Sequence, residues 1–148
     1  MNRLNDVEIL LVEDNPLDAE MTIRALRKCN VVNKLFWVKD GVEALNFLRC
    51  AGPYEGRVPT GQIKLVLLDL GLPRLNGIDV LREMRDDAHT KAIPVVVMTS
   101  SSRERDVLES HRLGVNGYVT KPVQFAAFAE VVSRVGMSWL LVEQVCAP

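Results

Sequence analysis

The sequence is poor in cysteine, histidine and aromatic residues, and it has no long apolar run. Its three cysteines, Cys29, Cys50 and Cys146, are odd in number and lack metal-ligand spacing. They are typical of reduced thiols, which predicts a cytoplasmic protein. With only two histidines, set far apart, a zinc site is not expected. No apolar stretch approaches the roughly 20 residues of a membrane span, and Met1 to Asp6 carry no signal-peptide core.

An excess of positive charge is also absent. The 18 basic and 19 acidic residues give a net charge of −1, so no basic field favours nucleic acid. Hydrophobic residues make up 48% of the chain, which is enough for a real core. A length of 148 residues without internal repeats predicts a single domain over 1–148.

Short apolar runs alternate regularly with segments of helical period. We expect strands over 8–12, 34–38, 64–70, 94–99 and 115–120, and helices over 16–30, 42–48, 78–87, 103–113 and 123–135. Asn15 before Pro16 is a typical helix start, and Gly114 a typical helix end. Residues 51–62 are the most loop-like segment. Buried strands alternating with helices predict an α/β fold, with a doubly wound five-stranded parallel sheet covered by helices on both faces.

Polar residues stand where these strands end. Glu13 and Asp14 follow the first strand, Asp69 ends the third, Thr99 ends the fourth, and Lys121 follows the fifth. The carboxyl ends of parallel strands meet at one edge of a sheet, so we expect these side chains to converge. Three carboxylates in one cleft repel each other unless a cation neutralises them. Oxygen ligands without soft donors favour a hard ion, most naturally Mg²⁺.

Four segments at these strand ends carry a resemblance to a known family. They are Leu11-Val12-Glu13-Asp14-Asn15, Leu67-Leu68-Asp69-Leu70-Gly71-Leu72-Pro73, Met98-Thr99-Ser100 and Tyr118-Val119-Thr120-Lys121-Pro122. In this order, over residues 7–135, they resemble the receiver domain of two-component response regulators. The resemblance implies a flavodoxin-like sheet with strand order 2-1-3-4-5. It also implies a stand-alone signalling protein that accepts a phosphoryl group from the phosphohistidine of a sensor histidine kinase.

The resemblance implies a role for each acidic position. Asp69 would be the phosphate acceptor and would also bind Mg²⁺, together with Asp14 and the backbone carbonyl of Gly71. Glu13 would act through metal-bound water. A carboxylate nucleophile gives an acyl phosphate, and a cation stabilises the charge on the transferred group. By themselves, Glu13 and Asp14 could also belong to a solvated helix-capping loop.

The remaining family positions are basic, hydroxylic or aromatic. By the resemblance, Lys121 would pair with the phosphoryl oxygens, and the Lys121–Pro122 bond would be cis. Thr99 and Tyr118 would form a switch pair whose movement reports the phosphoryl group. Plain structural interpretations remain open, with Thr99 as a β-branched strand residue and Tyr118 as a core aromatic.

Beyond the expected end of the last helix, residues 136–148 form an apolar extension. Trp139, Leu140, Leu141 and Val142 are too apolar for a free terminus, so we expect them to cover the domain or a second subunit in a homodimer. This extension, the Asn15–Asp18 sequence and the long 52–61 connection together resemble the small regulators paired with phytochrome-type kinases. No effector domain follows residue 148, so output through protein–protein contact is expected.

The same residues also bear on the other functions that this fold can support. An aspartate-nucleophile phosphatase needs a second Asp two residues after the first, and that position is Gly71. We therefore expect a signalling protein that catalyses only its own phosphorylation and dephosphorylation, and not an enzyme. Flavin binding is excluded because Glu13 and Asp14 would repel its phosphate. A receiver-like scaffold or dimerisation module that is never phosphorylated is the remaining alternative.

Overall fold

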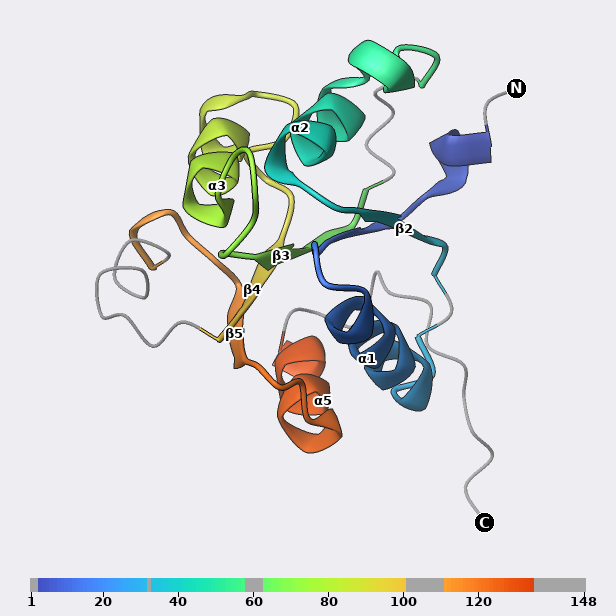
Figure 1. The fold of residues 1–148 in the computed structure, drawn as a ribbon, viewed down its shortest axis with the longest axis vertical. Coiled ribbons are helices and arrows are strands. Elements are labelled where there is room, and N and C mark those ends of the chain that lie inside the picture. Colours follow the sequence, from blue (N-terminus) through green and yellow to red (C-terminus); the bar gives the residue numbers. More distant parts are fainter. Residues whose placement is uncertain (1–2, 32, 58–62, 101–110, 135–148) are drawn as a thin grey trace.

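The central feature of the fold is a parallel β-sheet with helices on both faces (Figure 1). The computed structural model describes residues 3–31, 33–57, 63–100 and 111–134. Within them, five strands lie in the order β2-β1-β3-β4-β5, all pairing in parallel. The predicted fold class and strand order are therefore confirmed.

The observed elements agree closely with the expected ranges. The strands are β1 (Ile9–Val12), β2 (Leu35–Val38), β3 (Leu65–Asp69), β4 (Val95–Thr99) and β5 (Gly117–Thr120). The helices are α1 (Pro16–Lys28), α2 (Gly41–Arg49), α3 (Gly77–Asp86) and α5 (Phe125–Arg134), with 3-10 turns η1 (Arg3–Asp6) and η2 (Gly52–Tyr54). The helix expected over 103–113 lies mostly outside the described residues, and so does the extension 136–148. Where residues 111–114 are described, the chain turns at Gly114 with φ of +72°, as expected for a helix end.

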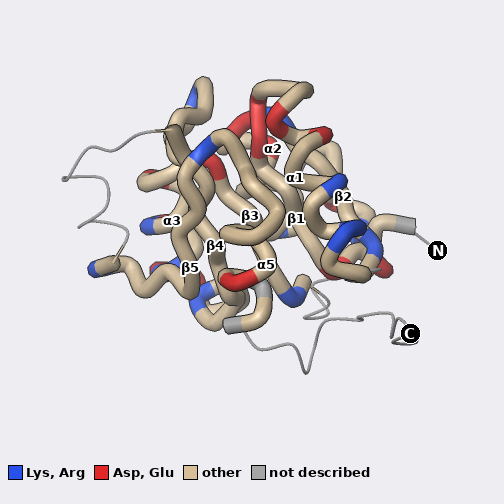
Figure 2. The backbone as a smooth tube through the Cα atoms, turned by 90° about the horizontal axis from the view of Figure 1, so that it is seen from below, with Lys and Arg blue, Asp and Glu red and all other residues tan. Residues whose placement is uncertain are grey.

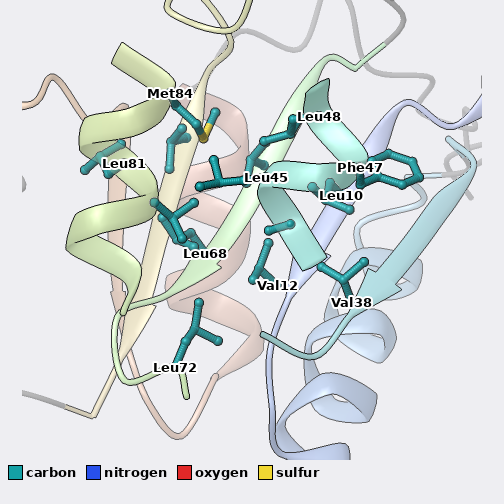
Figure 3. Packing of buried hydrophobic residues seen from close by; sticks show 14 of the residues in the cluster. Leu10, Val12, Val38, Leu45, Phe47, Leu48, Leu68, Leu72, Leu81 and Met84 are labelled. Atoms are coloured by element: carbon teal, nitrogen blue, oxygen red, sulfur yellow. The ribbon is translucent and has the colours of Figure 1, made fainter. Parts of the chain in front are cut away.

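Two apolar layers, one on each face of the sheet, stabilise the fold. Alternate residues of a strand point to opposite faces, so Leu10 and Val12 pack under α2 and α3, while Ile9 and Leu11 face α1 and α5. Figure 3 shows the first layer, where side chains from the strands meet those of α2 and α3. Strands buried on both faces leave polar side chains room only at the strand ends, and this is what concentrates them at one edge.

The loop between α2 and β3 is more structured than its composition predicts. Residues Gly52–Tyr54 form a 3-10 turn, and the following Arg57 is buried although it lies in a polar segment. The Arg57 guanidinium stacks on Phe47, 3.9 Å from the ring centroid, and donates to the backbone carbonyl of Phe47. A charged side chain stays buried here because its donors are satisfied by backbone oxygen and an aromatic face.

Basic and acidic residues both occur along the backbone drawn in Figure 2. This distribution fits the net charge of −1 and gives no basic face in that view. None of the described helices has the length and apolar character needed to cross a membrane.

Candidate functional site

The loop after β1 places two acids at the carboxyl edge of the sheet, in different environments. Glu13 is completely buried, whereas Asp14 is exposed. The Glu13 backbone is held from both sides, since its N–H donates to Val38 O at 3.0 Å and its carbonyl accepts from Trp37 Nε1 at 2.6 Å. Contacts with β2 therefore help to fix this loop in place.

Helix α1 begins directly after this loop. The side chain of Asn15 accepts from the N–H groups of Leu17 (2.9 Å) and Asp18 (3.2 Å), with Pro16 at the first helical position. This is the start predicted by the sequence. Its consequence for the site is that Asp18, in the first turn, points toward the carboxyl edge of the sheet.

Asp69 occupies the last position of β3 and is only 5% exposed. Its Oδ1 accepts a hydrogen bond from the N–H of Gly71 at 3.1 Å. On the other side of the backbone, Gly77 packs so closely that a Cβ there would lie 2.4 Å from the carbonyl oxygen of Asp69. The start of α3 is thus pressed against the strand end, and only glycine fits at that contact.

Lys121 brings the positive charge to this edge. Its peptide bond to Pro122 is cis, and its N–H donates to Thr99 O at 2.9 Å, which continues the pairing of β4 and β5. The ammonium group lies 3.0 Å from Asp69 Oδ2 and 3.1 Å from Asp18 Oδ2, and it also forms an ion pair with Glu13. Burial alone would lower the pKa of Lys121, but the hydrogen bonds that its ammonium donates to Glu13 and Asp69 outweigh burial and raise the pKa above its usual value.

The buried carboxyl group of Glu13 is perturbed in the opposite sense. Burial raises the pKa of Glu13 to about 7, against the lowering effect of its hydrogen bonds with Lys121 and Asn15, and repulsion from Asp69 raises it further. A carboxylate that resists ionisation in this way is stabilised by any additional cation beside it.

The acidic side chains form a group that suits a metal ion. One carboxylate oxygen from each of Glu13, Asp14 and Asp69 lies within 4.8 Å of the other two. All donors are hard oxygen atoms, and the single charge of Lys121 is shared with Asp18 as well. The donor set and its unbalanced charge therefore fit a hard divalent cation.

The two positions expected to act as a switch lie on the neighbouring strands. Thr99 ends β4 and is 2% exposed, and it pairs in register with Thr120 of β5. Tyr118 is half-buried on β5 and packs against the core layer under α2 and α3. Thr99 ends the strand that pairs with the Asp69 strand, and Tyr118 lies on the strand that leads to Lys121. The switch role of both residues stays a prediction.

Two residues of the site were not singled out from the sequence. Asp18 lies within the Asn15–Asp18 segment and Trp37 within the strand predicted over 34–38, and the sequence predicts no role in the site for either. Their contacts join segments distant in sequence, Asp18 with Lys121 and Trp37 with Glu13. No local pattern reports such contacts; the acidic residue in the first turn of α1 was the one available signal.

This combination of fold, strand-end acids and paired lysine agrees with comparisons to known proteins. Residues 9–133 match the response regulator receiver domain family. The chain belongs to this family. The response regulator Rcp1 of Synechocystis sp. is 37% identical over 132 residues, which cover 89% of this chain and 88% of Rcp1.

Solved structures of receiver proteins superpose over most of the chain. The bacteriophytochrome response regulator RtBRR has a TM-score of 0.83 and 40% identity, covering 93% of this chain and 82% of its own. The Mn²⁺-bound form of Rcp1 has a TM-score of 0.75 and 36% identity, covering 96% and 99%. The phosphorylated cyanobacterial phytochrome response regulator RcpA has a TM-score of 0.74 and 37% identity, covering 90% and 93%. The protein is thus a response regulator of two-component signalling, built as a receiver domain.

Proposed function

We propose that Asp69 of this response regulator is the phosphate acceptor, and that Lys121 and the acidic group beside it carry the transfer. The observation that supports this most directly is the contact between Lys121 Nζ and Asp69 Oδ2 at 3.0 Å, next to carboxylates that gather a cation.

The chemistry is a phosphoryl transfer between two protein side chains. One carboxylate oxygen of Asp69 attacks the phosphorus of a phosphohistidine, the P–N bond breaks, and its electron pair leaves with the imidazole, which takes up a proton. The ammonium group of Lys121 donates hydrogen bonds to the phosphoryl oxygens, whose negative charge increases in the transition state. The hydroxyl of Thr99 binds one of these oxygens, and Tyr118 follows it inward as the readout.

Mg²⁺ is the cation proposed for the acidic group. It would be held by Asp14, Asp69 and the carbonyl of Gly71, with Glu13 acting through water. When bound, it supplies positive charge for the phosphoryl oxygens. The hard donor set and the Mn²⁺-bound state of the relative Rcp1 both favour a divalent metal.

The residues favour retention of the phosphoryl group over rapid turnover. Gly71 stands where an aspartate-nucleophile phosphatase carries its acid–base carboxylate, so nothing at that position activates water. The protein therefore acts as a signal carrier whose only catalysis is its own phosphorylation and dephosphorylation.

A sensor histidine kinase is the proposed donor. Beside the site, α1 and the start of α5 expose three large apolar side chains, Leu17 (71%), Met21 (40%) and Phe125 (45%). Such an apolar patch is suited to contact with a partner protein. The names of RtBRR and RcpA favour a phytochrome-type kinase, and a cytoplasmic location follows from that pairing.

The apolar extension is proposed to mediate a homodimer. It lies outside the described residues, so the support is its sequence, in which Trp139 to Val142 are all apolar. Light scattering on the full chain tests this proposal. A variant with serine at both Leu140 and Leu141 is expected to be monomeric, while an unchanged mass would contradict it.

The phosphate acceptor is tested by incubating the protein with Mg²⁺ and acetyl phosphate. Wild type is expected to gain one phosphoryl group by intact mass, and Asp69→Asn none. Asp79→Asn is the matched control, because Asp79 lies on α3 outside the acidic group and its side chain forms an exposed ion pair with Arg82. Equal labelling of Asp69→Asn and wild type, or no labelling of wild type, would favour a phosphorylation-independent scaffold.

A further inference from the structure

The contacts of Lys121 point to one residue with a task of its own. Three carboxylates surround the ammonium group, and one of them, Asp18, lies outside the acidic group of Glu13, Asp14 and Asp69. We infer that Asp18 is the resting-state partner of Lys121 and that the lysine exchanges it for the phosphoryl group. This inference rests on the proposed role of Asp69 as acceptor.

The ammonium group is fully engaged in the resting site. A lysine donates at most three hydrogen bonds. Lys121 donates one to Asp18 and one to Asp69, and it forms a close ion pair with Glu13. The side chain of Lys121 is only 9% exposed, so water has little access to its ammonium group. For Lys121 to donate hydrogen bonds to several phosphoryl oxygens, one of its present acceptors has to lose its contact with the ammonium group.

Burial decides which acceptor is released. Phosphorylation turns the Asp69 carboxylate into an acyl phosphate, so the hydrogen bond from Lys121 to that residue passes to the phosphoryl group itself. Of the two other partners, the Glu13 side chain has no exposed surface, so losing the lysine would leave its charge buried without a partner. The Asp18 side chain is 28% exposed and can turn to water at little cost. Asp18 is therefore the partner from which Lys121 departs.

The backbone around Asp18 favours a side-chain rotation over a movement of the helix. Its N–H donates to Asn15 Oδ1, and its carbonyl accepts from Thr22 Oγ1 at 2.9 Å. Thr22 is itself completely buried between α1 and the sheet. Release thus changes the charge at the exposed start of α1 without unwinding its first turn.

Asp18 opposes the phosphorylated state in two ways. It occupies a proton of Lys121 that the phosphoryl group would use, and it places a negative charge near a group that is itself negative. Its neutral isostere should therefore hold the phosphoryl group more tightly. Asp18 is a positioning residue in this scheme, because it acts through Lys121.

The exchange is tested by the affinity of the full chain for beryllofluoride, an aspartyl phosphate mimic, at fixed Mg²⁺. Asp18→Asn is expected to bind it about threefold to tenfold more tightly than wild type, the range for removing one partly exposed charged partner. Asp18→Glu keeps the charge within reach of Lys121 and should stay close to wild type. Glu20→Gln is the matched control, since Glu20 is exposed on the same helix and forms an ion pair with Arg24.

A second comparison separates an effect through the lysine from a general effect of charge. In a Lys121→Met background, Asp18→Asn is expected to change the affinity less than it does beside an intact lysine. The inference is overturned if Asp18→Asn binds no more tightly than Glu20→Gln, or if its gain is undiminished without Lys121. The proposed function fails separately, by absence of Mg²⁺-dependent labelling of the wild-type Asp69.

Discussion

Replacing Glu13 by glutamine is expected to stabilise the metal-free protein at alkaline pH. Glutamine has nearly the shape of a protonated glutamic acid and carries no charge. Burial raises the pKa of Glu13 in the folded protein to about 7, above the ordinary value of 4.5. The unfolded chain thus loses this proton at lower pH than the folded chain does.

The sign and size of the effect follow from this difference. Stability from the protonated group is fully present below pH 4.5 and is lost as the pH rises toward 7, after which the loss is complete. The loss amounts to about 1 kcal/mol at pH 5 and about 3 kcal/mol at pH 8, at about 1.4 kcal/mol per pKa unit. Glu13→Gln avoids it, so its advantage over wild type should grow by about 2 kcal/mol between these values.

Urea unfolding in the presence of a chelator measures this advantage, with Glu20→Gln as an exposed control that should show none. Adding Mg²⁺ should reduce the advantage at pH 8, because a cation that binds only the folded state stabilises the ionised site. A Glu13→Gln protein that is no more stable than wild type at pH 8 would refute the reasoning. It would mean that Lys121 fully compensates the burial of the carboxylate.

Three further substitutions test the surroundings of the site. Trp37→Phe removes the 2.6 Å hydrogen bond to the carbonyl of Glu13 and should lower the free energy of unfolding by about 1–2 kcal/mol and weaken Mg²⁺ binding measured by calorimetry. Gly77→Ala should cost at least about 2 kcal/mol in urea unfolding, because its methyl group meets backbone at 2.4 Å, whereas Gly71→Ala has no contact closer than 3.8 Å and should be near neutral. Met21→Glu should slow transfer from a histidine kinase about tenfold, as for an interface anchor, without affecting labelling by acetyl phosphate.

The fold could be predicted from the sequence because its signals are local. Apolar runs of strand length, helical spacing between them and the Asn15-Pro16 helix start together specified the order of elements. The acids at the strand ends then followed from the parallel arrangement, which brings carboxyl ends to one edge. The burial of Arg57 in the α2–β3 loop could not be predicted in this way, because it depends on contacts with Phe47.

The parts of the site that were missed depend on tertiary contact. Glu13 was predicted to act at a metal site through water, but its complete burial was not predicted, because it depends on contacts with the indole of Trp37 and the ammonium of Lys121. The neighbourhood of Asp18 and Lys121 likewise depends on how α1 and β5 are placed against the sheet. Spacing along the chain carries no information about such distances.

The ion pairs of Lys121 also bear on how the protein is made. They join residues 52 positions apart, with Asp69, and 103 positions apart, with Asp18. Contacts between residues so far apart in the chain form late in folding, and a chain folds as its domain emerges during synthesis. Until Lys121 has been synthesised, the carboxylates of Asp18 and Asp69 lack the ammonium group that pairs with them, and the site is incomplete. A partly synthesised chain is therefore unable to take up a signal, and competence to receive a phosphoryl group reports that the domain is complete.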